Sequence, residues 1–444
     1  MGLAFAEPRV RKAISQVAAI GIIVVLVIVA AAGAYYFTST GPTNSTTTSS
    51  STGTGTALPF GGNIVVGVAA SQQGSFAVPG IAMLKGIRTA VQWVNTNGGV
   101  VVDGKTYNLT VVAYDDQSQP SNEAPLYTKM ITQDNAKFLI APYGSPLETA
   151  AEPIANQYKV VMVGSSCGSL QLFTSSNAYF VCTIDTGNQY IISPLEWLHA
   201  NHPSEKLAFI YSNDPLSISA IQGAEAYAKS VGLNVTYTDA YPSTATDLSS
   251  ILTAAKASGA TAIVGGGHIN DGELLVNQLH QIGWTPDFIS LLVAVEQPQF
   301  QQALGSLANG VTGTIFWKET LPYSPSEAAK QGMSWYGPTE DQFTSLYAQV
   351  AGGVPYGNDG EGASSILVLA KAIMTANSFN STLVRQALGS MNLMTFFGGF
   401  KVSSTGAQQQ PPPVLAQWQN GVLQIVYPTD VATAPIIYPY NPSG

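Results

Sequence analysis

Short apolar runs alternate with amphipathic stretches through the first half of the chain after residue 60. The runs span only four to six residues, and in the longer segments between them apolar residues recur at helical spacing. Runs this short, divided by helices, are typical of buried parallel strands joined by right-handed crossovers. The pattern predicts strands at 64–69, 109–114, 138–141, 160–163 and 179–183, with helices at 79–95, 123–134 and 146–157.

The same alternation begins again near residue 191. It predicts helices at 191–200, 219–231, 247–258 and 273–282, and strands at 207–211, 234–240, 262–265 and 288–292. Two successive α/β blocks of similar size indicate two lobes, and a cleft between lobes is a favoured site for a small ligand.

Later apolar runs indicate that the chain crosses between the lobes more than once. Residues 310–317 and 398–402 are candidate returning strands, and Asn420-Gly421 between two apolar runs predicts a β-hairpin. We therefore expect residues 59–185 and 315–397 in the first lobe. Residues 186–314 and 398–440 form the second lobe in this prediction.

A different pattern occupies the N-terminus. Residues 17–37 form an uncharged run of 21 residues, long enough to cross a bilayer as a helix. The basic residues Arg9, Arg11 and Lys12 precede the run, which orients the N-terminus inside and the rest of the chain outside. The run is longer than the core of a cleaved secretory signal. We expect residues 1–13 to be a cytoplasmic basic leader and 14–37 a transmembrane anchor.

Residues 38–58 contain mostly Thr, Ser and Gly and show no apolar periodicity. This composition predicts a flexible, solvated linker between the membrane and the lobes. If the chain lies outside the cell, its four Asn-x-Ser/Thr sequons become possible N-glycosylation sites. They begin at Asn44, Asn108, Asn234 and Asn380.

Composition narrows the range of functions. Charged residues make up only 10% of the 444 residues, and the formal net charge is −9. A chain with so few basic residues offers no patch for phosphate groups, so we expect no nucleic-acid partner. The two cysteines, Cys167 and Cys182, either pair as a disulfide in an oxidising compartment or remain buried thiols. The four histidines form no metal-ligand motif, and we expect no metal or cofactor.

Small polar residues follow two neighbouring predicted strands. The run 138–141 stops at Pro142, and the candidates Tyr143, Gly144 and Ser145 follow. The run 160–163 stops at Gly164, with the candidates Ser165, Ser166 and Cys167 just beyond. Ligands in open α/β sheets lie outside the carboxyl ends of the strands, and the start of the next helix favours an anionic group. Helix caps and tight turns are the alternative for each serine alone, but two such ends in succession predict a pocket.

Loops after other strands add further candidates. Gln72 and Gly74 lie in the polar loop after the first strand, and Asp185 follows the last strand of the first block. His268 follows three glycines at the end of the run 262–265, and Glu296 follows the run 288–292. His268 as a surface residue and Glu296 as a helix-start residue are the open alternatives.

The segment Arg11-Lys12-Ala13-Ile14-Ser15 resembles the pilin-type signal peptides of archaea, which some archaeal solute-binding proteins also carry. That resemblance implies cleavage after Ala13 and an anchor helix that stays on the mature protein. An uncleaved anchor is the alternative.

From about Asn63 to Pro428 the chain resembles the branched-chain-amino-acid type of ABC-transporter solute-binding proteins, and its ending is closer to the amide-binding branch. No single motif is specific, but their order along the chain is. The motifs are Gly74-Ser75, Met83-Leu84-Lys85-Gly86, Asn97-Gly98-Gly99-Val100, Asp115-Asp116, Ala141 to Ser145, Thr395-Phe396-Phe397-Gly398 and Gln417-Trp418-Gln419-Asn420-Gly421.

The resemblance implies an α/β, two-lobed type I periplasmic-binding fold, with two Rossmann-like parallel-sheet lobes joined by hinge crossovers and preceded by one transmembrane helix. Ser145 matches the serine that binds the ligand carboxylate, and Ser165, Ser166 and Cys167 fall on the next binding loop. Cys167 stands where the family usually has threonine. His268 replaces an aromatic tyrosine of the second lobe.

One departure concerns the glutamate that leucine binders place near Leu291 for the ligand's ammonium group. That position is apolar here, and the nearest acid is Glu296. The resemblance thus implies a membrane-anchored extracellular receptor that captures an amino acid, an amide or a similar small solute. It would deliver this ligand to the permease subunits of an ABC importer.

Three other functions can be weighed against this one from the sequence. An enzyme such as an amidohydrolase would need a nucleophile beside a base, or a metal set, and neither occurs, so we expect no enzymatic activity. A sensory ectodomain usually has a cytoplasmic signalling part, yet about 16 residues precede the apolar run. A pilin-like surface subunit would assemble filaments on residues 14–37.

Overall fold

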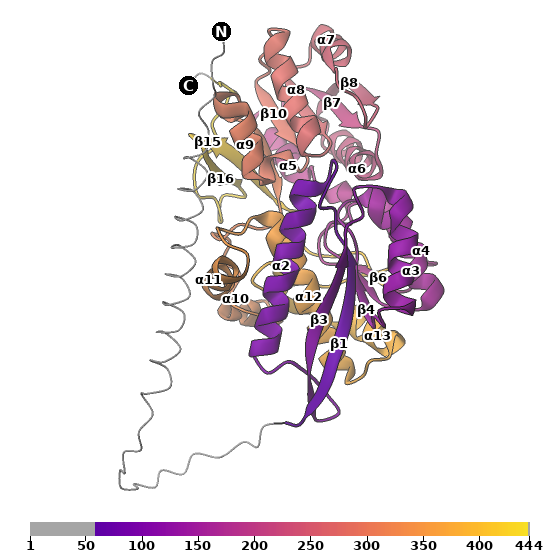
Figure 1. Ribbon diagram of the computed structural model, residues 1–444. Helices are drawn as coiled ribbons and strands as arrows, with labels where there is room; N and C mark the ends of the chain where they lie inside the picture. Colours follow the sequence, from indigo (N-terminus) through magenta and orange to yellow (C-terminus); the bar gives the residue numbers. More distant parts are fainter. Residues whose placement is uncertain (1–57, 443–444) are drawn as a thin grey trace, which may run out of the picture. The chain divides into compact units, whose positions relative to one another are not determined.

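The computed structural model describes residues 58–442. The predicted leader, transmembrane anchor and nearly all of the linker, together with the sequon at Asn44, lie outside the described residues. Leu58 to Gly444 form one compact unit, in which the elements group around two large sheets (Figure 1).

The first lobe is built on a six-stranded sheet with the order β2-β3-β1-β4-β5-β6. All neighbours are parallel except β2 and β3, which form an antiparallel hairpin. The strands are β1 (Phe60–Ala69), β2 (Val100–Val102), β3 (Lys105–Tyr114), β4 (Phe138–Ile140), β5 (Met162–Gly164) and β6 (Phe180–Cys182). The predicted alternation and parallel sheet are confirmed for this block.

Helices cover the first sheet. The helices and short 3₁₀ turns of this lobe are α2 (Ala77–Thr96), α3 (Pro120–Thr132), α4 (Ser145–Tyr158), η1 (Leu170–Leu172), α10 (Pro325–Lys330), α11 (Glu340–Val350), α12 (Gly357–Ala376) and α13 (Ser381–Ser390). α12 is almost wholly buried and packs along α2, as Figure 1 shows in orange and indigo. A Cβ on Gly86 would lie 1.7 Å from the Asp359 carbonyl oxygen, and one on Gly362 would lie 2.2 Å from that of Met83. Glycine on both helices therefore permits this close approach.

The second lobe is built on a seven-stranded sheet with the order β16-β15-β11-β10-β9-β7-β8. Its strands are β7 (Lys206–Ser212), β8 (Asn234–Tyr241), β9 (Ala262–Gly266), β10 (Phe288–Leu291), β11 (Thr312–Ile315), β15 (Val414–Gln419) and β16 (Val422–Tyr427). β15 and β16 pair antiparallel around Asn420 and Gly421, which confirms the predicted hairpin. The hairpin extends an otherwise parallel sheet through β11.

The helices of the second lobe alternate with its parallel strands, as the sequence predicts. They are α5 (Ile192–Asn201), α6 (Pro215–Val231), α7 (Ser249–Ala257), α8 (Ile269–Gln281) and α9 (Pro298–Leu304), with 3₁₀ turns η2 (Gly187–Gln189), η3 (Ala294–Glu296) and η4 (Gly305–Ala308).

A third, small sheet changes one predicted boundary. β12 (Ser334–Trp335), β13 (Leu393–Thr395) and β14 (Gly398–Phe400) form it, and β13 pairs with both neighbours. The strand predicted at 398–402 therefore pairs next to the first lobe instead of returning to the second. Gly406 still contacts the first lobe, since its carbonyl oxygen accepts a hydrogen bond from the backbone N–H of Cys182 at the end of β6. The last crossover comes later, between this contact and β15.

Among residues 58–442, no single helix is long and apolar enough to span a membrane. α12 and α13 meet the length and composition criteria only as a pair bent by 107°. Since α12 is a buried core helix, its apolar character is explained by packing inside the first lobe.

Candidate ligand site in the cleft between the lobes

The two predicted strand ends of the first lobe are tied to each other. Gly144 adopts a left-handed backbone conformation (φ 91°) that glycine tolerates, and its N–H donates to Ser166 Oγ over 2.9 Å. Ser145 begins α4, and its Oγ accepts a hydrogen bond from the Ser169 backbone N–H over 3.0 Å. These bonds fix the loops after β4 and β5 as one surface, which Tyr143, Gly144 and Ser166 present to the cleft.

Two of the predicted loop residues lie behind that surface. Ser165 is fully buried, and its hydroxyl has no hydrogen-bond partner among the described residues. Cys167 forms a disulfide with Cys182 at the end of β6, with 6.1 Å between the Cα atoms. Its sulfur is bonded and fully buried, so the structure removes Cys167 from the candidate contact residues. Ser145 is also fully buried and is not among the residues that line the cavity between the lobes, which is described below.

The second lobe contributes His268 at the start of α8. Its backbone N–H donates to Asp271 Oδ2 over 2.7 Å, which holds the residue at the helix terminus. Its ring lies edge-on to Phe76 at 4.8 Å and to Tyr143 at 6.2 Å, both of the first lobe. Both ring nitrogens are buried and have no partner within the described part of the chain. The ring thus connects the two lobes, and its nitrogens are left for a ligand.

Glu296 is the second contribution from that lobe. It ends η3, is 4% exposed, and its Oε1 has no hydrogen-bond partner among residues 58–442. Burial and the nearby Asp359 carboxyl raise the pKa of Glu296 to about 8, although a hydrogen bond from the Phe316 backbone acts in the opposite direction. Burial disfavours the charged form of a carboxyl that has no cation beside it. A positively charged group of a ligand placed next to Glu296 would therefore stabilise the carboxylate and bind to it.

α12 supplies polar residues that the sequence patterns did not indicate. Asn358 donates from Nδ2 to Glu361 Oε2 over 2.8 Å, and Gln297 donates from Nε2 to Asn358 Oδ1 over 2.6 Å. Burial and the neighbouring Glu296 carboxyl raise the pKa of Glu361 well above its usual range. The one signal in the sequence was the presence of acidic residues in an otherwise apolar helix.

These side chains enclose a cavity of ≈ 10 Å³, which holds about one water molecule. The lobes are therefore closed in this structure, and a ligand of amino-acid size needs them to separate. We call this space the inner cavity; its lining residues are Tyr143, Gly144, Ser166, Ile184, Tyr190, Leu216, His268, Val293, Glu296, Phe316, Asn358 and Glu361.

Besides Ser145, Ser165 and Cys167, three further predicted residues lie outside the inner cavity. The Gln72 N–H donates to Asp115 Oδ1 over 2.9 Å, and Gly74 lies against Ser118. The loop 71–76 is therefore held in place by the segment that directly follows β3. Asp185 is buried in a separate cavity beside the crossovers, and burial raises the pKa of its carboxyl to about 8. Phe76 at the end of the loop 71–76 contacts His268 of the second lobe.

No group of three or more His, Cys, Asp or Glu side chains in the described part of the chain could hold a metal ion. The described arrangement is thus one of hydroxyl, carboxyl, amide and imidazole groups between two lobes.

Comparison with known proteins places this fold in a family. The sequence pattern described as periplasmic binding protein matches residues 63–422. The chain belongs to this family. A relative named Leu/Ile/Val-binding protein homolog 7, from Brucella suis biovar 1 (strain 1330), is 23% identical over 400 residues, which cover 86% of this chain and 96% of the relative.

Two solved structures show the same fold. The branched-chain amino acid substrate-binding protein LivJ from Streptococcus pneumoniae, in complex with isoleucine, superimposes with a TM-score of 0.68 at 21% identity and covers 85% of this chain and 100% of that one. A solute-binding protein of an ABC transporter from R. palustris, in complex with 4-hydroxybenzoate, gives 0.68 at 18% identity, with 81% and 95% covered. The chain has the type I periplasmic-binding fold. Its family consists of solute-binding proteins and not of enzymes.

Proposed function

We propose that the chain is the membrane-tethered receptor of an ABC importer and that it captures a small solute with an ammonium group between its lobes. The observation that carries the proposal is the inner cavity, where polar atoms of His268 and Glu296 that have no partner within residues 58–442 meet the loop surface of the first lobe. The two lobes close around the ligand by the hinge motion common to such binding proteins. The closed form then docks on the permease subunits.

The charges of the inner cavity favour an ammonium group over a lone carboxylate. Glu296 and Glu361 line it, whereas no Lys or Arg side chain of the described part of the chain does. A benzoate such as the one bound by the R. palustris protein would bring a negative charge beside these carboxyls without a cation to balance it. An amino acid or amino amide carries an ammonium group that can pair with the Glu296 carboxylate. Its carboxyl or amide end then meets backbone N–H groups near the start of α4.

The proposal is tested on the full-length chain, purified in detergent micelles without refolding. Native mass spectrometry, followed by identification of the molecule released on denaturation, is expected to find an amine-containing solute at one per chain. Recovery of an aromatic or aliphatic acid without an amine would contradict the ligand class. A protein that is empty and binds no amino acid, amide or carboxylate in calorimetry would contradict the receptor function itself.

A matched pair of variants tests the role of Glu296 once a ligand is identified. Glu296→Gln keeps the size of the side chain and removes its charge, so we expect the dissociation constant to rise at least tenfold. Glu225→Gln makes the same change at an exposed position on α6 and is expected to leave it unchanged. Equal affinities of both variants would show that the carboxylate does not bind the ligand.

A further inference from the structure

A second and larger cavity lies beside the inner cavity and shares Glu296 with it. Its volume is ≈ 410 Å³, and we call it the outer compartment. Both lobes build it, since one wall comes from the segment 354–357 before and at the start of α12 and the others from the second lobe and its crossover. The lining residues are Glu296, Pro298, Gln301, Gln302, Ile315, Trp317, Lys318, Glu319, Val354, Pro355, Tyr356, Gly357, Trp418, Gly421, Val422 and Leu423.

The inner walls of the outer compartment are aromatic and aliphatic. Trp317 donates its indole N–H to the Phe396 carbonyl oxygen over 3.1 Å, and Trp418 donates its own to the Val295 carbonyl oxygen over 3.1 Å. With these polar atoms already bonded, the indole rings offer the compartment only apolar surface. Ile315 and Leu423 add aliphatic surface.

The rim of the compartment exposes apolar side chains. Val354 is 59% exposed, Val422 51% and Tyr356 41%, and they come from opposite lobes. Exposed apolar residues that gather around a cavity indicate a surface that a ligand covers.

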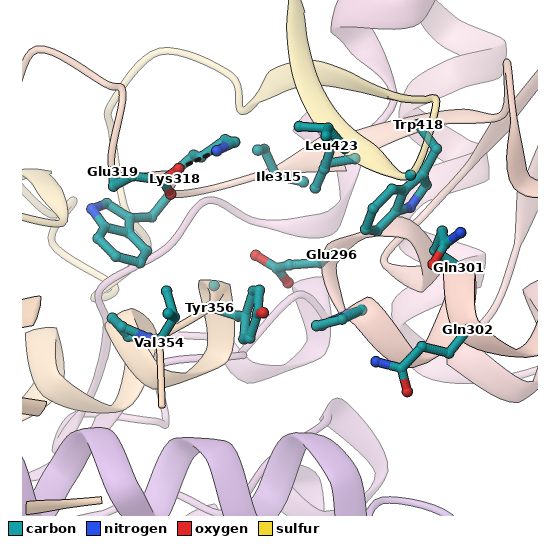
Figure 2. A pocket seen from close by; sticks show the side chains of 16 residues that line it. Glu296, Gln301, Gln302, Ile315, Lys318, Glu319, Val354, Tyr356, Trp418 and Leu423 are labelled. Carbon is teal, nitrogen blue, oxygen red and sulfur yellow. Dashed lines mark hydrogen bonds and ion pairs between the residues drawn. The ribbon is translucent and has the colours of Figure 1, made fainter. Parts of the chain in front are cut away.

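The Glu296 carboxyl lies at the inner end of the outer compartment. Figure 2 shows the Glu296 carboxyl among the lining side chains, with Leu423 and Trp418 on one side and Tyr356 on another. A Cβ on Gly357 would lie 1.8 Å from Glu296 Oε1, so glycine at this position leaves the room that the carboxyl occupies. At the outer edge, Lys318 and Glu319 form an ion pair and balance each other. The Oε1 atom of Glu296 is buried and has no hydrogen-bond partner among residues 58–442, so it is the polar group left for a ligand at the inner end of this compartment.

We propose that the outer compartment holds the apolar body of a ligand whose ammonium group is bound by Glu296. The substrate class is thus an amine with an aliphatic or aromatic group, and the side chain lies toward Trp317, Trp418 and Leu423. This inference rests on the proposed function, because it assigns a second part of the same ligand site. Since both lobes line the compartment, such a ligand also stabilises the closed form.

The test uses a series of probes on the full-length chain in nanodiscs, with empty nanodiscs as the blank. Isothermal titration calorimetry compares ethylamine, butylamine and hexylamine, with hexanoate as the probe of equal length and opposite charge. Burial of each added methylene is expected to tighten binding by about fourfold until the compartment is filled. Hexanoate is expected not to bind.

Filling the compartment gives the decisive variant. Leu423→Trp is expected to remove the gain from butylamine to hexylamine and to leave ethylamine unchanged. Leu383→Trp makes the same change on α13, at a leucine that is 46% exposed and lines neither cavity, and is expected to behave as wild type. If Leu423→Trp does not fold, Val354→Ser at the exposed rim is expected to weaken hexylamine binding several-fold without affecting ethylamine.

The outcomes separate this inference from the proposed function. Equal affinities along the amine series, or a gain that survives Leu423→Trp in a folded protein, overturn the outer compartment as a ligand site. If the chain still releases or binds an amine-containing solute, the proposed receptor function stands. Binding of hexanoate in preference to hexylamine overturns both the inference and the proposed ligand class.

Discussion

Carboxyl side chains lie in the interior of the first lobe without the cations that usually accompany buried acids. Glu123 is fully buried, both of its oxygens lack partners among the described residues, and burial with the nearby Asp116 and Glu148 carboxyls raises its pKa to about 9. The two ion pairs formed within residues 58–442, between Lys318 and Glu319 and between Lys330 and Glu327, are elsewhere. At neutral pH the folded protein therefore holds Glu123 as a neutral acid.

This residue predicts that the protein is more stable in acid than at neutral pH. A carboxyl whose pKa is raised on folding contributes fully below its unfolded pKa of about 4.5 and loses that contribution as the pH rises toward 9. One pKa unit corresponds to about 1.4 kcal/mol, so the free energy of unfolding should fall by on the order of 2–3 kcal/mol between pH 5 and pH 7 from Glu123 alone. Thermal unfolding should show a melting temperature several degrees lower at pH 7.

The variant Glu123→Gln is expected to flatten this profile and to stabilise the protein at pH 7, because it cannot ionise. Glu225→Gln, at an exposed site, serves as the control and should keep the wild-type profile. A wild-type protein whose melting temperature rises from pH 5 to pH 7 would contradict the interpretation.

The proposed role of Glu296 predicts a pH dependence of binding. Its pKa is about 8 without ligand, so an ammonium ligand must displace a proton below that pH, and affinity should rise about tenfold per unit up to pH 8. The titratable groups around Glu296 are Tyr143, Tyr190, His268 and Glu361 at the inner cavity, and Lys318, Glu319 and Tyr356 at the outer compartment. Asp359 lies near Glu296 outside both cavities. Calorimetry at pH 6, 7 and 8 measures the slope, and the loss of that slope in Glu296→Gln assigns it to this carboxyl. An affinity that is constant from pH 6 to pH 8 contradicts the role.

At the scale of elements, close contacts hold the cleft walls in place. α12 carries Asn358 and Glu361 into the inner cavity, and its position depends on the approach to α2 through Gly86 and Gly362. The loop after β5 is held to the end of β6 by the disulfide between Cys167 and Cys182. Both devices position residues that line the inner cavity, although Gly86, Gly362, Cys167 and Cys182 do not line it themselves.

Substitution of Gly362 by alanine tests the helix contact. The new methyl group would lie 2.2 Å from a backbone oxygen of α2, which cannot move independently, and we expect a loss of about 1–3 kcal/mol in the free energy of unfolding. Gly389→Ala on the exposed helix α13 is the matched control and should be neutral or slightly stabilising, because alanine favours helices. Denaturant unfolding measures both, and equal effects would contradict the packing argument.

Removal of the disulfide tests the second device. The cysteines are 15 residues apart in sequence, and closing a loop of that length stabilises a protein by about 3 kcal/mol. The double variant Cys167→Ala, Cys182→Ala is expected to unfold at lower denaturant concentration by this amount. Reducing agent should lower the stability of wild type but not that of the variant. A reductant effect on the variant would show that another process causes the loss.

At the scale of the whole molecule, the proposed function requires a tether that keeps the receptor at the membrane while its lobes open and close. The apolar run at 17–37 and the Ser/Thr/Gly linker after it supply the proposed tether. The full-length chain is expected to stay with membranes after carbonate extraction, and a chain that starts at residue 59 should be released to the soluble fraction. Intact-mass measurement tells whether Ile14 is the first residue. Release of the full-length chain by carbonate would contradict the anchor.

Much of the fold could be predicted because its signals are local. The strand runs, the amphipathic helices and the Asn420-Gly421 turn each depend on neighbouring residues, and the structure confirms the two parallel blocks and the hairpin. The strand at 398–402 was assigned to the wrong lobe because an apolar run does not reveal its partner, which is β13.

The site was predictable only in part. Tyr143, Gly144, Ser166, His268 and Glu296 lie at ends of strands or just beyond them, where the sheet topology brings them to one edge, and all five line the inner cavity. Gln72, Gly74 and Asp185 occupy similar places in the sequence but point to neighbouring loops or to a separate cavity. Asn358 and Glu361 could not be found from a strand end because they lie inside a helix.

The sequence by itself determined the alternation of elements, the strand ends and the candidate tether, since each follows from the spacing of apolar and polar residues along a few turns or strands. The tertiary structure decided that Cys167 pairs with Cys182, because β5 and β6 bring Gly164 opposite Cys182. It also decided that Glu296 packs against Gly357 and lines one cavity together with Trp317 and Trp418. Those groups come from segments far apart in the chain, and only the packing of helices and strands sets their distances.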